Sequence, residues 1–358
     1  MTVAGARRAF VADGADQTVV AAVRASGIPI VEVAHAGAAS VMAAITARIG
    51  EAPGLAIVAT VDAAVHAALD EATRERVPLI VLARTSVTRT GGAARPHDHE
   101  DVDELARAIG GAARPLLVAG RGCRAPAVGA WLRAFAEALP APVLVTPAGR
   151  GALPDPHPLC HGLLAPGAAI LSRADLVITL GVDDDELASP GVTIARALRI
   201  HDVGAVLEEL APRLRDHTRA DWDVAELDRL RRARAAPDLD AGLAALVARL
   251  REATPAGTAA IFTRALAPAA QIWHVVQPGE ALVADNPIAA SVAVTLERPE
   301  FLALAFANPG REDVARLGCD DAARAGVRVV TPPAAELGHA IEAEVARTGP
   351  RVIVVPLV

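Results

Sequence analysis

The chain has 358 residues, a formal net charge of −7 at neutral pH, and 53% hydrophobic residues. This length predicts two or three domains, each large enough to bury its own core. The acidic balance and the dispersed Lys and Arg residues argue against a nucleic acid partner. No apolar run approaches the roughly eighteen residues of a membrane span, so we expect a cytoplasmic protein without a membrane partner.

Short apolar segments typical of buried strands alternate with segments of helical periodicity along the whole chain. Helical periodicity is clear in residues 126–139 and 334–347. The alternation predicts an α/β protein with three Rossmann-like (flavodoxin-like) units and mainly parallel sheets covered on both faces. The predicted strands are residues 28–33, 55–59, 78–83, 115–119, 142–146, 176–180, 198–201, 281–284, 301–306, 327–330 and 351–355.

Turn-rich and charged segments predict the boundaries between these units. The first unit is expected at residues 1–96 and ends in a polar stretch rich in Gly, Pro and His. The second is expected at residues 98–216. A charged linker at residues 217–237 then leads to the third unit, at residues 238–358.

Two clusters contain side chains that bind metals in other proteins. Residues 97–101 read His-Asp-His-Glu-Asp, and residues 183–186 read Asp-Asp-Asp-Glu after a predicted strand. A linker followed by a helix start explains the first cluster, because acidic residues there complement the helix dipole. A solvated loop explains the second. We therefore predict no metal site.

The three cysteines lack the short paired spacing of a disulfide framework or a zinc knuckle. Cys160 lies beside His161, and Cys123 lies in a glycine-containing turn. Neither has the motif of a nucleophile elbow around it. We expect both thiols to be buried and to act as small hydrophobic side chains.

Residues 35–48 resemble the His-Glu-x-Ala-Ala-x-x-Met-Ala helix of thiamine-diphosphate (ThDP) enzymes of the acetolactate synthase type. The residues in register are His35, Ala38, Ala39, Met42, Ala43, Ala47 and Arg48. In that family the glutamate after the histidine hydrogen-bonds the aminopyrimidine ring and drives ylid formation. Ala36 stands at that position here. The resemblance therefore implies the fold and argues against the usual chemistry.

The central part of the chain gives the strongest resemblance, because segments 114–122, 141–163, 174–181 and 201–202 follow the motifs of the family's middle domain in order. In relatives this domain binds FAD or ADP, or is purely structural. A glycine turn before a helix can bind a pyrophosphate through backbone N–H groups. Two interpretations are open: a tight turn that requires glycine, or a nucleotide site. The candidate nucleotide-binding residues are Gly120, Arg121, Gly122 and Asp202.

The outer units resemble shortened pyrimidine-binding and diphosphate-binding domains. Residues 60–64 replace the family's Thr-Ser-Gly-Pro-Gly loop, and the Gly-Asp-Gly motif of its Mg²⁺ site is absent from the sequence. Asn308 is the one candidate remnant of the metal-binding asparagine. Because the glutamate, the glycine loop and the metal motif are missing together, we expect no ThDP and no Mg²⁺.

This degenerate resemblance is compatible with two functional classes. The first is a pseudoenzyme or regulatory subunit, which forms a homodimer, a higher homo-oligomer, or a mixed dimer with a full-length homologue. The second is a repurposed enzyme without a cofactor, or half of a heteromeric ThDP enzyme, acting on a small carbonyl or 2-oxo acid substrate. His35 is the candidate catalytic residue, because imidazole titrates near neutral pH; the alternative is a structural histidine.

Overall fold

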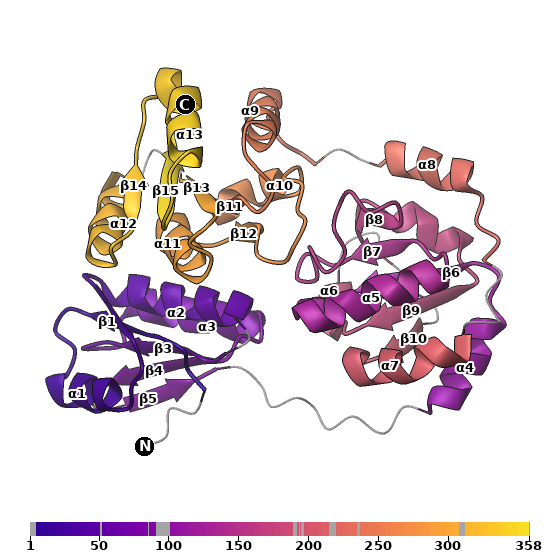
Figure 1. Ribbon diagram of the computed structural model, residues 1–358, viewed down its shortest axis with the longest axis horizontal. Coiled ribbons are helices and arrows are strands. Elements are labelled where there is room, and N and C mark those ends of the chain that lie inside the picture. Colours follow the sequence, from indigo (N-terminus) through magenta and orange to yellow (C-terminus); the bar gives the residue numbers. More distant parts are fainter. Residues whose placement is uncertain are drawn as a thin grey trace. The chain divides into compact units, whose positions relative to one another are not determined.

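The computed structural model describes residues 5–50, 52–84, 86–90, 101–188, 192, 194, 197–214, 220–234, 237–307 and 312–357. Three five-stranded sheets follow one another along the chain, with helices between their strands (Figure 1). All strand pairs are parallel except one. The predicted α/β class with mainly parallel sheets is therefore confirmed. None of the described helices combines the length and the hydropathy that crossing a membrane requires.

The first sheet has the strand order β2-β1-β3-β4-β5, and β5 is antiparallel to β4. Its strands are β1 (Ala9–Ala12), β2 (Ile30–Val33), β3 (Gly54–Ile57), β4 (Leu79–Ala83) and β5 (Ser86–Arg89). The helices between them are α1 (Gln17–Ala25), α2 (Ala36–Gly50) and α3 (Ala63–Arg74). The turn from β2 to α2 therefore lies at the carboxyl edge of the sheet, where α/β proteins bind ligands.

The second sheet has the order β10-β9-β6-β7-β8 and is entirely parallel. Its strands are β6 (Pro115–Ala119), β7 (Val143–Val145), β8 (Cys160–Leu163), β9 (Leu176–Leu180) and β10 (Ala197–Ile200). Its helices are α4 (Val102–Gly110), α5 (Pro126–Ala138), α6 (Asp184–Leu187), α7 (Val203–Leu214) and α8 (Val224–Arg232), with 3-10 turns η1 (Arg121–Cys123) and η2 (Ala168–Arg173).

The third sheet has the order β12-β11-β13-β15-β14 and is also parallel. Its strands are β11 (Ala259–Phe262), β12 (Ala281–Val283), β13 (Leu302–Phe306), β14 (Arg328–Val330) and β15 (Arg351–Val355). The helices are α9 (Ala241–Glu252), α10 (Ala267–Ala270), α11 (Pro287–Glu297), α12 (Glu312–Arg324) and α13 (Leu337–Val345), with 3-10 turns η3 (Arg264–Leu266) and η4 (Ala334–Glu336).

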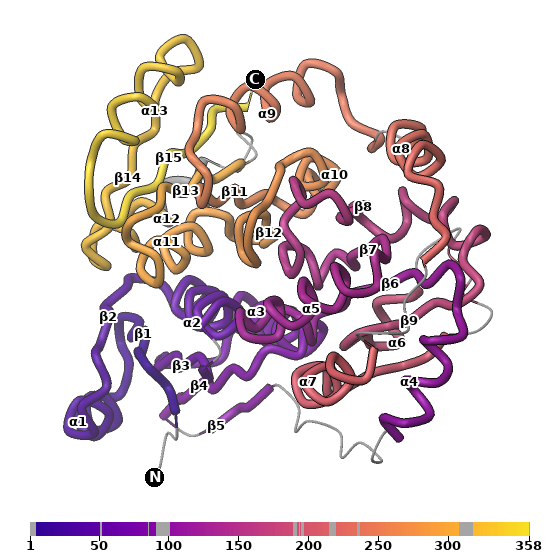
Figure 2. Tube along the Cα trace, turned by 45° about the vertical axis from the view of Figure 1, so that its right-hand side comes forward, coloured from indigo at the N-terminus to yellow at the C-terminus, as the bar shows by residue number. Residues whose placement is uncertain are grey.

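The first and third sheets belong to one compact unit, and the second sheet forms another with residues 274–278. In the first of these units α2 packs along α11, as both views show (Figure 2). Both helices contribute fully buried small side chains, such as Ala39, Ala43, Ala290 and Ala293, to one core shared by both sheets. Because the distance between packed helices depends on side-chain size, alanine allows a close approach.

Four of the described strands were not predicted from the sequence, and each omission has a physical reason. The strands β1 and β11 are four-residue runs in which two residues are alanine, so their composition does not distinguish a buried strand from a helix turn. β5 is a polar edge strand, and β8 is an edge strand whose register is interrupted by an irregularity. Part of the segment expected as a linker is helix α8, because Leu227 is buried in a core of the second unit.

We predict that Gly54→Ala lowers the free energy of unfolding by about 2 kcal/mol or more. A Cβ at this first residue of β3 would lie 2.0 Å from the carbonyl oxygen of Ala43 in α2, so two backbones would have to separate. The matched control is Gly338→Ala in α13, where a Cβ meets no atom within 4 Å. Chemical denaturation measures both variants, and equal effects would contradict the prediction.

Candidate active site

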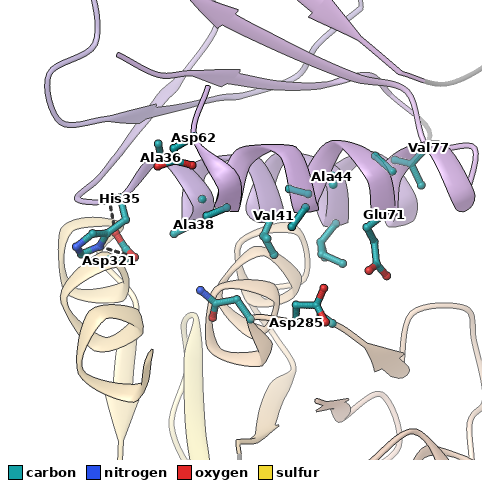
Figure 3. Close-up of a pocket in the computed structure, with 18 of the residues that line it drawn as sticks. His35, Ala36, Ala38, Val41, Ala44, Asp62, Glu71, Val77, Asp285 and Asp321 are labelled. Carbon is teal, nitrogen blue, oxygen red and sulfur yellow. Dashed lines mark hydrogen bonds and ion pairs between the residues drawn. The ribbon is translucent and has the colours of Figure 1, made fainter. Parts of the chain in front are cut away.

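A cavity of about 470 Å³ lies in the first compact unit, lined by α2, α3, the end of β12, and α12 (Figure 3). Most of its wall consists of small apolar side chains that project from α2 and α3. Polar groups gather at its two ends: His35 and Asp321 at one, and Glu71 and Asp285 at the other. An apolar cavity with a few convergent polar groups is the usual form of a small-molecule site.

The histidine end is organised by Asp321, whose side chain is 1% exposed. Its Oδ1 accepts hydrogen bonds from the backbone N–H groups of Ala34 and His35, at 2.7 and 3.0 Å. Its Oδ2 lies 3.1 Å from Nδ1 of His35. Burial raises the pKa of Asp321, and the hydrogen bonds from His35 and Ala34 oppose that rise.

This contact fixes the role of each imidazole nitrogen. An ionised Asp321 accepts the Nδ1 proton, which leaves Nε2 as the basic nitrogen. Within the described residues Nε2 has no hydrogen-bond partner, and the His35 side chain is 39% exposed. The arrangement can therefore accept and return a proton at Nε2. His35 was the candidate catalytic residue of the sequence analysis and stays a prediction; Asp321 was not a candidate, since no local pattern distinguishes it from its neighbour Asp320.

Ala36, the first residue of α2, lines the cavity beside His35. Its methyl side chain cannot accept or donate a proton. The next residue is Gly37. A Cβ at this position would lie 2.6 Å from the Cβ of Ala64 in α3, so the close approach of the two helices requires glycine here. Asp62, also in the cavity wall, caps α3 by accepting a hydrogen bond from the N–H of Val65.

At the other end of the cavity three charged groups form one network. The guanidinium of Arg264 donates to Asp285 at 3.2 and 3.3 Å and also to Glu71. The hydrogen bond to Asp285 is the main cause that raises the pKa of Arg264. Arg48 forms an ion pair with Glu75 at 3.4 Å. The arginine charges near the cavity are thus already engaged with carboxylates.

The candidate nucleotide residues of the second unit are engaged in structural contacts. A Cβ at Gly120 would lie 2.4 Å from the carbonyl oxygen of Gly181, and one at Gly122 would lie 2.8 Å from its Cα. Arg121 is 10% exposed and forms ion pairs with carboxylates in residues 183–186. Asp202 lies 3.4 Å from the N–H of Ala205 at the start of α7. These contacts support the tight-turn interpretation, and a nucleotide here stays a prediction.

The acidic run at residues 183–186 is paired with Arg121 and Arg199. Glu186 is buried, and it accepts hydrogen bonds from Thr146 and from two backbone N–H groups. Residues 97–100 and Asn308 lie outside the described residues. Across the described part of the chain, no group of three or more His, Cys, Asp or Glu side chains is arranged to hold a metal ion.

Cys123 and Cys160 are buried, and burial raises their pKa values to about 12 and about 11. Both are therefore protonated at neutral pH and are poor nucleophiles. Burial is also the main cause that lowers the pKa of His161 to about 4, with Arg231 and Arg234 adding to the shift. A nucleophilic pair at Cys160 and His161 is thus not supported.

Comparisons with known proteins show similarity in sequence for the central segment and in fold for the whole chain. Residues 102–203 match the family described as "Thiamine pyrophosphate enzyme, central domain". The fold resembles the crystal structure of a "putative thiamin diphosphate-dependent enzyme" from Mycobacterium smegmatis, with a TM-score of 0.65 and 17% identity over 98% of this chain and 96% of that one. The central segment of the chain is therefore similar to the central domain of thiamine-diphosphate enzymes, and the whole chain resembles one such protein in fold.

Curated relatives in this superfamily match over a shorter stretch. The "Probable 2-ketoarginine decarboxylase AruI" of Pseudomonas aeruginosa is 37% identical over 117 residues, which cover 30% of this chain and 20% of the relative. The acetolactate synthase of Mycobacterium bovis is 39% identical over 98 residues, or 26% and 16% of the two chains. The matched stretch thus spans a fifth or less of these relatives.

One expectation is contradicted by these findings. The sequence analysis expected no cofactor and judged ThDP unlikely, whereas the matching family and the structural relative are ThDP-dependent enzymes, which points to ThDP. The error came from treating missing motifs in the outer units as loss of the cofactor. The described residues fit ThDP in part: the cavity has an apolar wall, but Ala36 supplies no carboxylate and no metal-binding group is present among those residues.

We predict that His161 makes stability fall as the pH drops from about 6.5 to about 4. In this range the unfolded chain binds a proton at His161 and the folded chain does not, which costs up to about 3 kcal/mol. His161→Gln is expected to flatten the pH dependence of the unfolding free energy. The control is His66→Gln, at an exposed position of α3. Identical slopes for His161→Gln and the unmodified protein would contradict the prediction.

Proposed function

We propose that this chain is an enzyme of the ThDP superfamily in which His35 is the general acid–base residue for a carbonyl substrate bound in the 470 Å³ cavity. The observation that carries the proposal is the hydrogen bond of 3.1 Å between Nδ1 of His35 and the buried Asp321. A carboxylate that holds one imidazole nitrogen leaves the other available for proton transfer.

Each residue of the pair has a separate task. Nε2 of His35 takes a proton from the bound substrate and returns it to the product. Asp321 holds the ring in its orientation and stabilises the imidazolium that forms, because its negative charge is 1% exposed and therefore weakly screened. ThDP, when bound, supplies an electron sink for the carbanion chemistry of carbonyl compounds. Because Ala36 has no ionisable group, His35 is the acid–base residue at this end of the cavity.

The shape of the cavity supports a small carbonyl or 2-oxo acid substrate that carries an apolar chain. The cavity follows α2 from Ala36 to Arg48, which is about 18 Å at the rise of an α-helix. Ala38, Val41 and Ala44 line this path between the two polar ends (Figure 3). An aliphatic or aromatic chain would bury its surface there while its carbonyl reaches His35.

A second candidate function is a subunit that completes its site with another chain. The observation that favours it is the absence of a carboxylate at Ala36 and of a metal-binding group within the described ranges. A full-length homologue in a mixed dimer would supply both groups.

The first test measures turnover of a panel of 2-oxo acids and aldehydes with ThDP and Mg²⁺ present. We expect His35→Ala to lower kcat/KM by about 100-fold or more, the usual contribution of a general acid–base group. Asp321→Asn is expected to lower kcat with little change in KM, and to shift the pH dependence of kcat. His66→Ala, at the exposed face of α3, is the matched control. An unchanged rate in His35→Ala would contradict the assignment.

The second test separates the two candidates by calorimetric titration of Mg²⁺ and ThDP. We expect the chain alone to bind the cofactor, and Ala36→Glu to increase turnover because it restores a carboxylate at this position. Binding that requires a full-length homologue from the same host would favour the partner subunit. No binding in either sample would contradict both candidates.

A further inference from the structure

A second cavity, of about 320 Å³, lies at the other edge of the third sheet. Its walls include Arg328 at the start of β14, Arg351 at the start of β15, and Glu344 and Arg347 near the end of α13. In a parallel sheet these strand starts form the amino edge, whereas the His35 cavity meets the carboxyl end of β12. The two cavities are therefore separate.

Glu344 organises two of the arginines. Its carboxylate is 3% exposed and accepts hydrogen bonds from Nε of Arg328 at 3.0 and 3.2 Å. Nε of Arg347 forms an ion pair with the same carboxylate at 3.3 Å. Both guanidinium groups are thus held by their Nε edges, and within the described residues their terminal N–H groups have no hydrogen-bond partner. Both side chains are about half exposed, at 54% and 55%.

The third arginine adds a charge that no carboxylate balances. Arg351 is 5% exposed, and its guanidinium donates to the backbone carbonyl groups of Glu344, Gly349 and Glu300. Three arginines and one carboxylate leave a formal charge of +2 on the cavity lining. The carboxyl end of α13 offsets roughly half a unit of this charge. The excess is local, because the whole chain carries −7.

We propose that this cavity binds a phosphate group, either free phosphate or a phosphate monoester. Two guanidinium groups with free terminal N–H pairs match the oxygen atoms of a tetrahedral dianion, which accepts bidentate hydrogen bonds from each. Neutralising Glu344 requires one of its two arginine partners, so the charge of the other is explained by an anionic ligand, and Arg351 adds a further positive charge to the lining. The volume leaves room for a small organic group beside the phosphate. The site is remote from His35, which suits a regulatory ligand.

The test is thermal unfolding and calorimetry of the full chain with inorganic phosphate at constant ionic strength, with chloride as the reference anion. Millimolar phosphate is expected to raise Tm of the unmodified protein, because it binds the folded state. Arg328→Gln/Arg347→Gln is expected to weaken binding at least tenfold. Arg347→Gln alone keeps the Arg328–Glu344 ion pair. This variant is expected to weaken phosphate binding several-fold.

The matched control is Arg199→Gln, which removes an exposed arginine paired with Asp184 in the second unit. An equal Tm rise in the double variant would show a general salt effect and overturn the proposal, as would no phosphate effect in the unmodified protein. Phenyl phosphate distinguishes the two ligand sources: tighter binding than phosphate indicates a monoester, and weaker binding indicates the free anion. Neither result affects the test of His35.

Discussion

The close packing of α2 against α11 is the contact on which the rest of the first compact unit depends. Both helices are apolar on nearly every face, and their buried residues are mostly alanine and valine. A helix of this kind is stable only when it is enclosed by other elements. Enclosing both helices merges the first and third sheets into one core, which brings the β2–α2 turn next to α12.

The contact between His35 and Asp321 in the cavity follows from this shared core. Residue 35 comes from the first sheet and residue 321 from the third, and they meet because the two sheets share helices at their contact. Asp321 also accepts two backbone hydrogen bonds from the β2–α2 turn, so the group that orients His35 also attaches α12 to the first sheet. Positioning and stability thus rest on one buried carboxylate, whose burial raises its pKa.

The sequence predicted the elements whose signal is local. Strands β6, β9 and β15 have the predicted bounds, because each is a five-residue apolar run between polar or turn residues. The strands β1 and β11 were missed because each is short and half alanine, a residue that favours helix over strand. Asp321 lies 286 positions from His35, so a single sequence offers no signal that joins them. The prediction of no cofactor failed because it relied on short motifs in the outer units, each of which reflects a single contact with the cofactor. The similarity to ThDP enzymes is instead found in the central domain and in the fold.

The alanine-rich wall of the cavity has a consequence for how this protein can change. The wall residues project from α2 and α3, and alanine to leucine or methionine is nearly neutral for helix propensity. A substitution at the exposed Ala67 would therefore shorten or reshape the cavity while the backbone stays in place. Such a wall is readily altered one side chain at a time, so new ligand preferences can evolve, or be engineered, without disturbing the pair at its end.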